Sequence, residues 1–260
     1  MPGASVAGRT PPQERLRHAE PVMGTVFSID IPAAAAGTLP DVVRWLHWVD
    51  ATFSPYRENS DVSRFGRGEL ALTQCVPALA EVIGECAAIR DLSGGYFTDT
   101  PGGRFDPSGL VKGWAIEHAA AMLSAAGFTG HIINGAGDMQ CTGEPEPGRP
   151  WRVGIADPLN PSALAVVIAG RDFAVATSGT AERGQHIINP HTGCAASGLA
   201  SVTIVGPRVT AADAYATAAF AMGAAARRWV ETLDGYEAFA VGPDGSSWQT
   251  SGFQAYVPTD

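Results

Sequence analysis

Residues 105–118 combine groups that can bind an anion at the start of a helix, in the order FDPSGLVKGWAIEH. Asp106 is a good N-cap residue, and Pro107 suits the first helical position because proline has no N–H to lose there. Such a start leaves backbone N–H groups unpaired and pointing at whatever lies ahead of the helix. Lys112, the only lysine of the chain, follows about one turn later. The segment indicates either an anion site or a capped helix with a surface lysine.

A second candidate site lies in AADAYATAAF, residues 211–220. Asp213 and Thr217 are four residues apart, so on a helix they share one face, and the alanines around them are too small to shield them. A carboxylate, a hydroxyl and backbone carbonyls are hard oxygen ligands suited to Mg²⁺, which keeps water and substrate phosphates as its other ligands. The alternative is that Asp213 caps its helix and Thr217 bonds to a carbonyl within it.

Two glycine-rich loops could also approach a ligand. NGAGD, residues 134–138, follows the apolar run HII, and its glycines allow close backbone contact. Its spacing is neither that of a Walker loop nor that of the dinucleotide fingerprint, so a tight turn is the equal alternative. The second loop, residues 177–190, carries hydroxyls beside a glycine and then His186, which is either catalytic or structural.

The elements that position these residues come in blocks rather than in strict βαβ alternation. Alternating residues predict strands at TVFSIDI and along several short segments after residue 130, and FAVGPDGSSWQ predicts a hairpin with an Asp-Gly turn. This pattern favours a single α+β domain with a mainly antiparallel sheet. Helical spacing of apolar residues predicts helices over 38–53, 73–95 with Thr73 as a cap, 113–126 and 210–234.

Composition narrows the class of protein. The 260 residues are 45% hydrophobic and 17% charged, which is typical of a folded soluble domain. A net charge of -9 argues against a nucleic-acid partner, and no run approaches the roughly 20 apolar residues of a membrane span. The four cysteines lack zinc-type spacing, so reduced thiols are expected. The N-terminal stretch shows no signal peptide or lipid-attachment cysteine, so we expect a short disordered leader and a cytoplasmic protein.

Several motifs in order give the chain a resemblance to the ApbE-like flavin transferases, the FAD:protein FMN transferases, from about residue 22 to residue 223. The resemblance implies an ApbE-like, T-fold-like α+β domain over 21–260, after a disordered leader at 1–20. The motifs are MGT (23–25), FSPY with S.VSRF (53–65), GGYF (94–97), FDPSGLVKG (105–113), IINGAGD (132–138), VATSG (175–179), HIINPHTG (186–193) and DAYAT (213–217).

The resemblance also implies the residues of a site. Asp213 and Thr217 would supply side-chain ligands to Mg²⁺, and the main-chain carbonyl of Gly109 a third. His186 would be the catalytic base, on residue type alone, and Asp213 would be catalytic through the metal. The residues implied in FAD binding are Met23, Tyr56, Tyr96, Phe97, Thr98, Asp106, Lys112, His186 and Ile188.

Three positions depart from the family pattern. Thr98 stands where the family usually has Asp directly after the GG-x-Phe turn, and Asp99 comes one residue later. Asn189 replaces the Asp of the usual HIIDP form. Gly109 replaces a common Ala, a change that leaves the carbonyl intact.

The implied reaction is phosphoryl transfer from FAD. A Ser or Thr hydroxyl of an acceptor protein would attack the FMN-side phosphorus, and AMP would leave, with Mg²⁺ neutralising charge on the leaving oxygens. Two alternatives stay open: a metal-dependent FAD pyrophosphatase that yields FMN and AMP, and a non-catalytic FAD-binding protein. Replacing Lys112 with Met is expected to cost FAD binding far more than stability.

Overall fold

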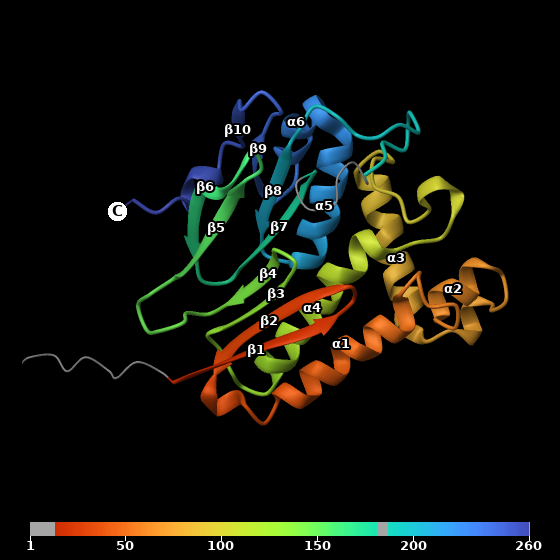
Figure 1. The fold of residues 1–260 in the computed structure, drawn as a ribbon, viewed down its shortest axis with the longest axis horizontal. Helices are drawn as coiled ribbons and strands as arrows, with labels where there is room; N and C mark the ends of the chain where they lie inside the picture. Colours follow the sequence, from red (N-terminus) through yellow and green to blue (C-terminus); the bar gives the residue numbers. More distant parts are fainter. Residues whose placement is uncertain (1–13, 181–186, 260) are drawn as a thin grey trace, which may run out of the picture.

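The computed structural model describes residues 14–180 and 187–259 (Figure 1). Within these residues, the main sheet has eight strands in the order β1-β2-β3-β4-β7-β8-β9-β10, and β5 and β6 form a separate ribbon. All of these pairings are antiparallel, as the block pattern of the sequence predicted. The strands are β1 (Arg15–Val22), β2 (Thr25–Pro32), β3 (His131–Gly135), β4 (Asp138–Thr142), β5 (Trp151–Asp157), β6 (Asn160–Gly170), β7 (Phe173–Gly179), β8 (Ser201–Gly206), β9 (Glu237–Val241) and β10 (Ser247–Gln249).

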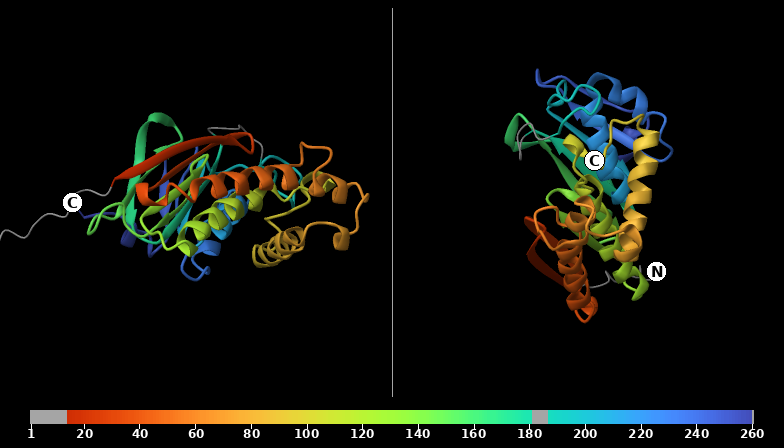
Figure 2. Two further views of the ribbon diagram at one scale, coloured as in Figure 1. Left: turned by 90° about the horizontal axis from the view of Figure 1, so that it is seen from below. Right: turned by 90° about the vertical axis from the view of Figure 1, so that its right-hand side faces the viewer.

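The helices cover one face of the main sheet and extend past its end. Figures 1 and 2 show α2 and α3 at the end of the molecule away from β5 and β6. None of the helices in the described ranges is long and apolar enough to cross a membrane. The α-helices are α1 (Leu39–Phe53), α2 (Asp61–Gly66), α3 (Pro77–Leu92), α4 (Ser108–Ala125), α5 (Val209–Met222) and α6 (Ala226–Val230), and short 3-10 turns are η1 (Ala33–Ala35), η2 (Leu72–Gln74), η3 (Pro101–Gly103), η4 (Gly223–Ala225) and η5 (Phe253–Tyr256).

Strand β8 runs through the middle of the layers and is buried at every position. Val202 and Ile204 point to the helix side, where they join the apolar cluster under α5. Val205 points to the opposite face, where it packs with residues of the β5–β6 ribbon. Because both faces of β8 are covered, its polar residues Ser201 and Thr203 are buried as well as its apolar ones.

Helices α4 and α5 lie against each other and against the sheet, in the centre of the fold (Figure 1). The buried face of α5 is almost entirely alanine, including Ala212, Ala216 and Ala219. Small side chains let the backbones of two helices and of a sheet approach closely. The alanines therefore set the short separation between α5, α4 and the sheet. The candidate metal ligands are carried on this pair of helices.

Three predicted helices differ from the observed ones. The helix predicted over 113–126 already begins at Ser108, directly after Pro107. The helix predicted at 73–95 begins at Pro77, because proline fixes its own φ and disfavours the helical conformation for the residue before it. Thr73 therefore lies in η2 and is not a cap. The helix predicted at 210–234 is interrupted at Gly223, which has φ of 59°. An added Cβ there would lie 2.7 Å from the Ser197 carbonyl, so only glycine fits the break.

The predicted leader was too long. Residues 15–20 belong to β1, which pairs along its whole length with β2. Arg15 and Arg17 both bind Asp30, at 2.6 and 3.1 Å, so partners on β2 order a strand with little apolar character. Residues 1–13 lie outside the described residues.

Candidate functional site

The only lysine of the chain pairs with two acidic residues that are far away in the sequence. Lys112, in the first turns of α4, lies with Nζ in contact with Asp138 and 3.2 Å from Oδ2 of Asp213. The side chains of Asp138 and Asp213 are 2% and 8% exposed. Two buried carboxylates therefore share one ammonium, and the group keeps an excess of negative charge. That excess suits a further cation.

Asp138 is fixed in place by the sheet. It opens β4, and its Oδ1 accepts a hydrogen bond of 3.0 Å from the backbone N–H of Thr177 on β7. The Thr177 hydroxyl in turn bonds to Thr203 at 2.8 Å. One oxygen of Asp138 thus meets the backbone of a central strand, and the other meets Lys112.

The carboxylate of Asp213 joins the two central helices. Its Oδ2 accepts the backbone N–H of Gly113 at 3.0 Å. In a regular helix that N–H would donate to the carbonyl of Gly109, four residues earlier. A backbone carbonyl has two lone pairs, so the Gly109 oxygen can accept this helical bond and still offer one lone pair to a cation.

Gly109 and Thr217 face each other across the helix pair. A Cβ built on Gly109 would lie 3.9 Å from Cγ2 of Thr217 and 3.3 Å from the ring of Phe97. Thr217 is half-buried one turn beyond Asp213 on the same face of α5. We call this group the α4–α5 site. It consists of Gly109, Lys112, Gly113, Asp138, Asp213 and Thr217.

The oxygen atoms of the α4–α5 site fit Mg²⁺. Asp213 offers a carboxylate, Thr217 a hydroxyl and Gly109 a carbonyl, all hard ligands. No cluster of three or more His, Cys, Asp or Glu side chains able to hold a metal occurs in the described part of the chain. A cation here would therefore depend on hydroxyl and carbonyl oxygens and on substrate phosphates, as Mg²⁺ does in phosphoryl-transfer sites.

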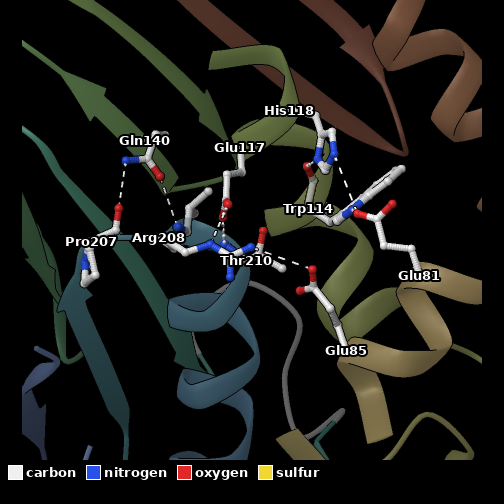
Figure 3. Close-up of polar contacts among 10 residues, drawn as sticks. Glu81, Glu85, Trp114, Glu117, His118, Gln140, Pro207, Arg208 and Thr210 are labelled. Carbon is white, nitrogen blue, oxygen red and sulfur yellow. Dashed lines mark hydrogen bonds and ion pairs between the residues drawn. The ribbon is translucent and has the colours of Figure 1, made fainter. Parts of the chain in front are cut away.

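The N-terminus of α5 is held by side chains from α4 and β4 (Figure 3). Glu117 accepts from Nε of Arg208 at 2.7 Å and from the backbone N–H of Thr210 at 3.1 Å. Gln140 accepts the N–H of Val209 at 3.0 Å. These bonds replace the missing cap of α5, whose N-cap Arg208 makes no side-chain cap bond. They fix the start of the helix that carries Asp213.

A second carboxylate from α3 lies at the same helix end (Figure 3). Glu85 is 3.7 Å from the Arg208 guanidinium. Burial raises the pKa of Glu85, and Arg208 opposes that shift. Arg208 forms ion pairs with both Glu85 and Glu117 at the start of α5. These residues support the α4–α5 site by fixing the position of the helix that carries Asp213.

The GG-x-Phe turn packs beside the site, and the FAD contacts expected of Tyr96, Phe97 and Thr98 stay predictions. Phe97 is buried, with its ring under Gly109, and Tyr96 meets the His191 ring edge-on at 4.4 Å. The Thr98 hydroxyl accepts the N–H of Thr100 within its own turn. Asp99, which follows, is buried and pairs with Arg90 at 3.1 Å. The shifted aspartate is thus engaged with α3.

Asp106 lies at the start of α4, one residue earlier than the cap position. Pro107 is the N-cap and Ser108 the first helical residue. The carboxylate of Asp106 accepts the N–H of Ser108 at 3.0 Å. Its own N–H donates to the Asp99 carbonyl at 2.7 Å, which ties the GG-x-Phe loop to the helix start.

Other residues implied in FAD binding are spread around the site. Met23 has φ of 55° and forms the β1–β2 turn with Gly24, while Tyr56 is 93% exposed after α1. Among the described residues, no hydrogen bond, ion pair or ring contact joins either of them to the α4–α5 site. Their role in binding FAD stays a prediction.

The segment after TSG is only partly described. His186 lies outside the described residues. Ile188 is 40% exposed and forms an isolated bridge with Ala195. Asn189, the residue that departs from the family pattern, donates to the Ala221 carbonyl at 3.1 Å and accepts the N–H of His191 at 2.9 Å. It therefore shapes its loop and ties it to the end of α5.

Sequence reasoning left Asp138 without a role. It ends the IINGAGD motif, which was weighed as a ligand loop or a tight turn. The turn is observed: Asn134 accepts the N–H of Gly137 at 2.9 Å, and Ala136 has φ of 53°. The sequence feature that could have indicated a role is the acidic residue at the start of a predicted strand, since Asp138 is buried there.

Comparison with known proteins gives relatives that share this arrangement of elements. A FAD:protein FMN transferase of Vibrio cholerae is 27% identical over a 282-residue alignment that covers 84% of this chain and 84% of the relative. A FAD:protein FMN transferase of Salmonella typhimurium is 25% identical over 175 residues, 62% of this chain. That match spans 50% of the relative's length.

The fold is shared with solved structures. The flavin transferase ApbE from Vibrio cholerae superimposes with a TM-score of 0.84 at 21% identity, over 95% of this chain and 100% of that one. The predicted α+β class is therefore confirmed, with an ApbE-like architecture. The ApbE family model matches residues 23–103 and 98–240, most of the chain. This protein belongs to the ApbE family.

Proposed function

We propose that this chain is a Mg²⁺-dependent FAD:protein FMN transferase that moves FMN from FAD onto a Ser or Thr hydroxyl of an acceptor protein. The observation that carries the proposal is the meeting of Gly109, Asp213 and Thr217, from two helices far apart in sequence, beside Lys112. Relatives named FAD:protein FMN transferase support the reaction type.

Metal binding and phosphate binding fall to different residues of the α4–α5 site. Asp213, Thr217 and the Gly109 carbonyl would hold Mg²⁺, which would neutralise charge on the pyrophosphate oxygens. The Lys112 side chain is 21% exposed, and its ammonium can donate to a phosphate oxygen of FAD. The buried ring of Phe97 packs below Gly109 and sets its position.

The transfer step balances with these groups. The acceptor hydroxyl oxygen forms a bond to the phosphorus of the FMN half, and the bond from that phosphorus to the bridging oxygen breaks. AMP leaves with the bridging oxygen, and the hydroxyl proton passes to a base. We propose His186 as that base from its residue type; it lies outside the described residues. Water in place of the hydroxyl would give FMN and AMP.

Incubating the purified protein with FAD and Mg²⁺, with and without an acceptor protein, tests the proposal. A flavin-fluorescent acceptor band on a denaturing gel, with AMP formed in equal amount, supports transfer. Free FMN and AMP at the same rate with and without acceptor would identify a pyrophosphatase, and unchanged FAD a binding protein. Asp213→Asn should abolish turnover, whereas Asp30→Asn, a matched carboxylate on β2, should not.

We also propose a cytoplasmic location for this reaction. The four cysteines are free thiols, and Cys86 and Cys141 are buried, which fits a reducing compartment. Cell fractionation with a reporter fusion would test this, and recovery from an extracytoplasmic fraction would contradict it.

A further inference from the structure

Among the described residues, Asp138 meets the α4–α5 helix pair through Lys112 and the sheet through the Thr177 N–H. We propose that Asp138 is a positioning residue, the permanent partner that keeps the Lys112 ammonium at the site when Asp213 engages a cation. This inference rests on the proposed function, because it assumes that Asp213 is a cation ligand.

The two carboxylates differ in how firmly they are held. Asp138 lies in the sheet, and Thr177 on the neighbouring strand β7 donates to its second oxygen. Asp213 lies on α5, and both of its polar contacts within the described residues use Oδ2. Among the described residues, Oδ1 of Asp213 has no polar partner and can meet a ligand, whereas each oxygen of Asp138 already has one partner.

Charge predicts what a cation does to this arrangement. A divalent ion at Asp213 neutralises the carboxylate that attracts Lys112 and repels the ammonium. Lysine has a flexible four-carbon stem, and the side chain of Lys112 is partly exposed, at 21%, so a change of rotamer can move the ammonium away from Asp213. The carboxylate of Asp138 opposes that departure because it stays charged, buried and fixed.

This arrangement serves phosphate binding directly. An ammonium has three donors, so Lys112 can keep Asp138 and exchange its Asp213 contact for a phosphate oxygen. Its position is then set before the substrate arrives, which lowers the cost of ordering a long side chain. A purely structural Asp138 would hold β4 to β7 and would leave the mobility of Lys112 unaffected.

The single lysine makes the test direct. Protein grown with ¹³Cε,¹⁵Nζ-lysine gives one side-chain ammonium signal, from Lys112, in NMR spectra of the whole chain. A held ammonium exchanges slowly with water and stays visible, and a solvent-exposed one disappears. In the wild-type protein we expect the signal to persist from zero to saturating Mg²⁺. Displacement of Mn²⁺, followed by electron paramagnetic resonance, reports the occupancy.

In Asp138→Asn, which keeps an acceptor for the Thr177 N–H, the signal should be visible without Mg²⁺ and lost at saturation. Asp30→Asn should behave as wild type. Loss of the wild-type signal with Mg²⁺, or its retention in Asp138→Asn, would overturn the inference. The wild-type titration decides even if the variant does not fold. A wild-type protein that binds neither Mn²⁺ nor Mg²⁺ would instead refute the proposed metal site, and this inference with it.

Discussion

The backbone N–H of Gly113 donates to the carboxylate of Asp213 over 3.0 Å, across a hundred residues of sequence. The bond requires the backbone of α4 to touch α5, and glycine permits the approach. A Cβ on Gly113 would lie 2.6 Å from the Val209 carbonyl and 3.0 Å from Cβ of Asp213. The geometry of the α4–α5 site therefore depends on the absence of one side chain.

We predict that Gly113→Ala forces the helices apart. Overpacking of this kind costs about 1–3 kcal/mol of unfolding free energy, more than the gain in helix propensity of about 1 kcal/mol. Urea denaturation should show the loss, and Mn²⁺ affinity should fall with it. Gly84→Ala is the matched control: Gly84 lies in α3 with nothing within 4 Å of an added Cβ, so that variant should be slightly more stable than wild type. A Gly113→Ala protein with both properties unchanged would contradict this account.

Glu117 should stabilise the fold through the N-terminus of α5 (Figure 3). Replacing it with Ala removes the acceptor for the Thr210 N–H and the partner of Arg208, at a cost of about 1–2 kcal/mol of unfolding free energy. Glu117→Gln keeps an acceptor oxygen and should lose less than half as much. Thermal and urea unfolding of the two variants would check this, and equal losses would show that the charge matters more than the cap.

His131 should make the folded state sensitive to acid. It is fully buried at the start of β3, and burial lowers its pKa to about 4, partly opposed by the carbonyls of Ala120 and Phe128. The unfolded chain therefore binds this proton more readily than the folded one. The contribution of neutral His131 is complete above pH 6.5 and is lost as the pH falls toward 4, by about 3 kcal/mol.

The comparison that isolates this group is His131→Leu. Between pH 7 and pH 4 the unfolding free energy of the variant should fall by about 3 kcal/mol less than that of wild type. Other groups titrate equally in both proteins, so only the difference between the two curves counts. Parallel curves would show that His131 takes up its proton equally in the folded and unfolded states, which would contradict the lowered pKa.

How much of the site could be predicted depends on the range of each contact. Asp213 and Thr217 share a helix face by local spacing, as expected, and the start of α4 follows from Asp106 and Pro107 to within one residue. The pairing of Lys112 with Asp138 arises only when the β3–β4 hairpin returns a strand beside α4. No local pattern encodes that meeting.

The helix ends show the same limit. Pro77 and Gly223 override the apolar periodicity that predicted longer helices, since one fixes φ and the other adopts a positive φ. Asn189 was noted only as a departure from the family pattern. Its bond to the Ala221 carbonyl joins positions 32 residues apart, so this role is visible only in the folded chain.

The ion pairs of Lys112 change the outcome expected for its replacement. Sequence reasoning placed the cost of Lys112→Met mainly in FAD binding. In the structure the substitution also leaves the buried carboxylates of Asp138 and Asp213 without their positively charged partner. Breaking a buried pair from one side costs about 3–5 kcal/mol, since an uncompensated charge remains. Lys112→Met should therefore lose both FAD binding and several kcal/mol of unfolding free energy.

A second substitution and a cation should each compensate for the lost ammonium. Adding Asp138→Asn should restore part of the stability and none of the FAD binding. Mg²⁺ should stabilise the single variant more than wild type, because a cation at Asp213 replaces the positive charge of Lys112. Urea denaturation with and without Mg²⁺ measures each of these differences, and a Lys112→Met protein as stable as wild type would show that the two carboxylates are compensated by water.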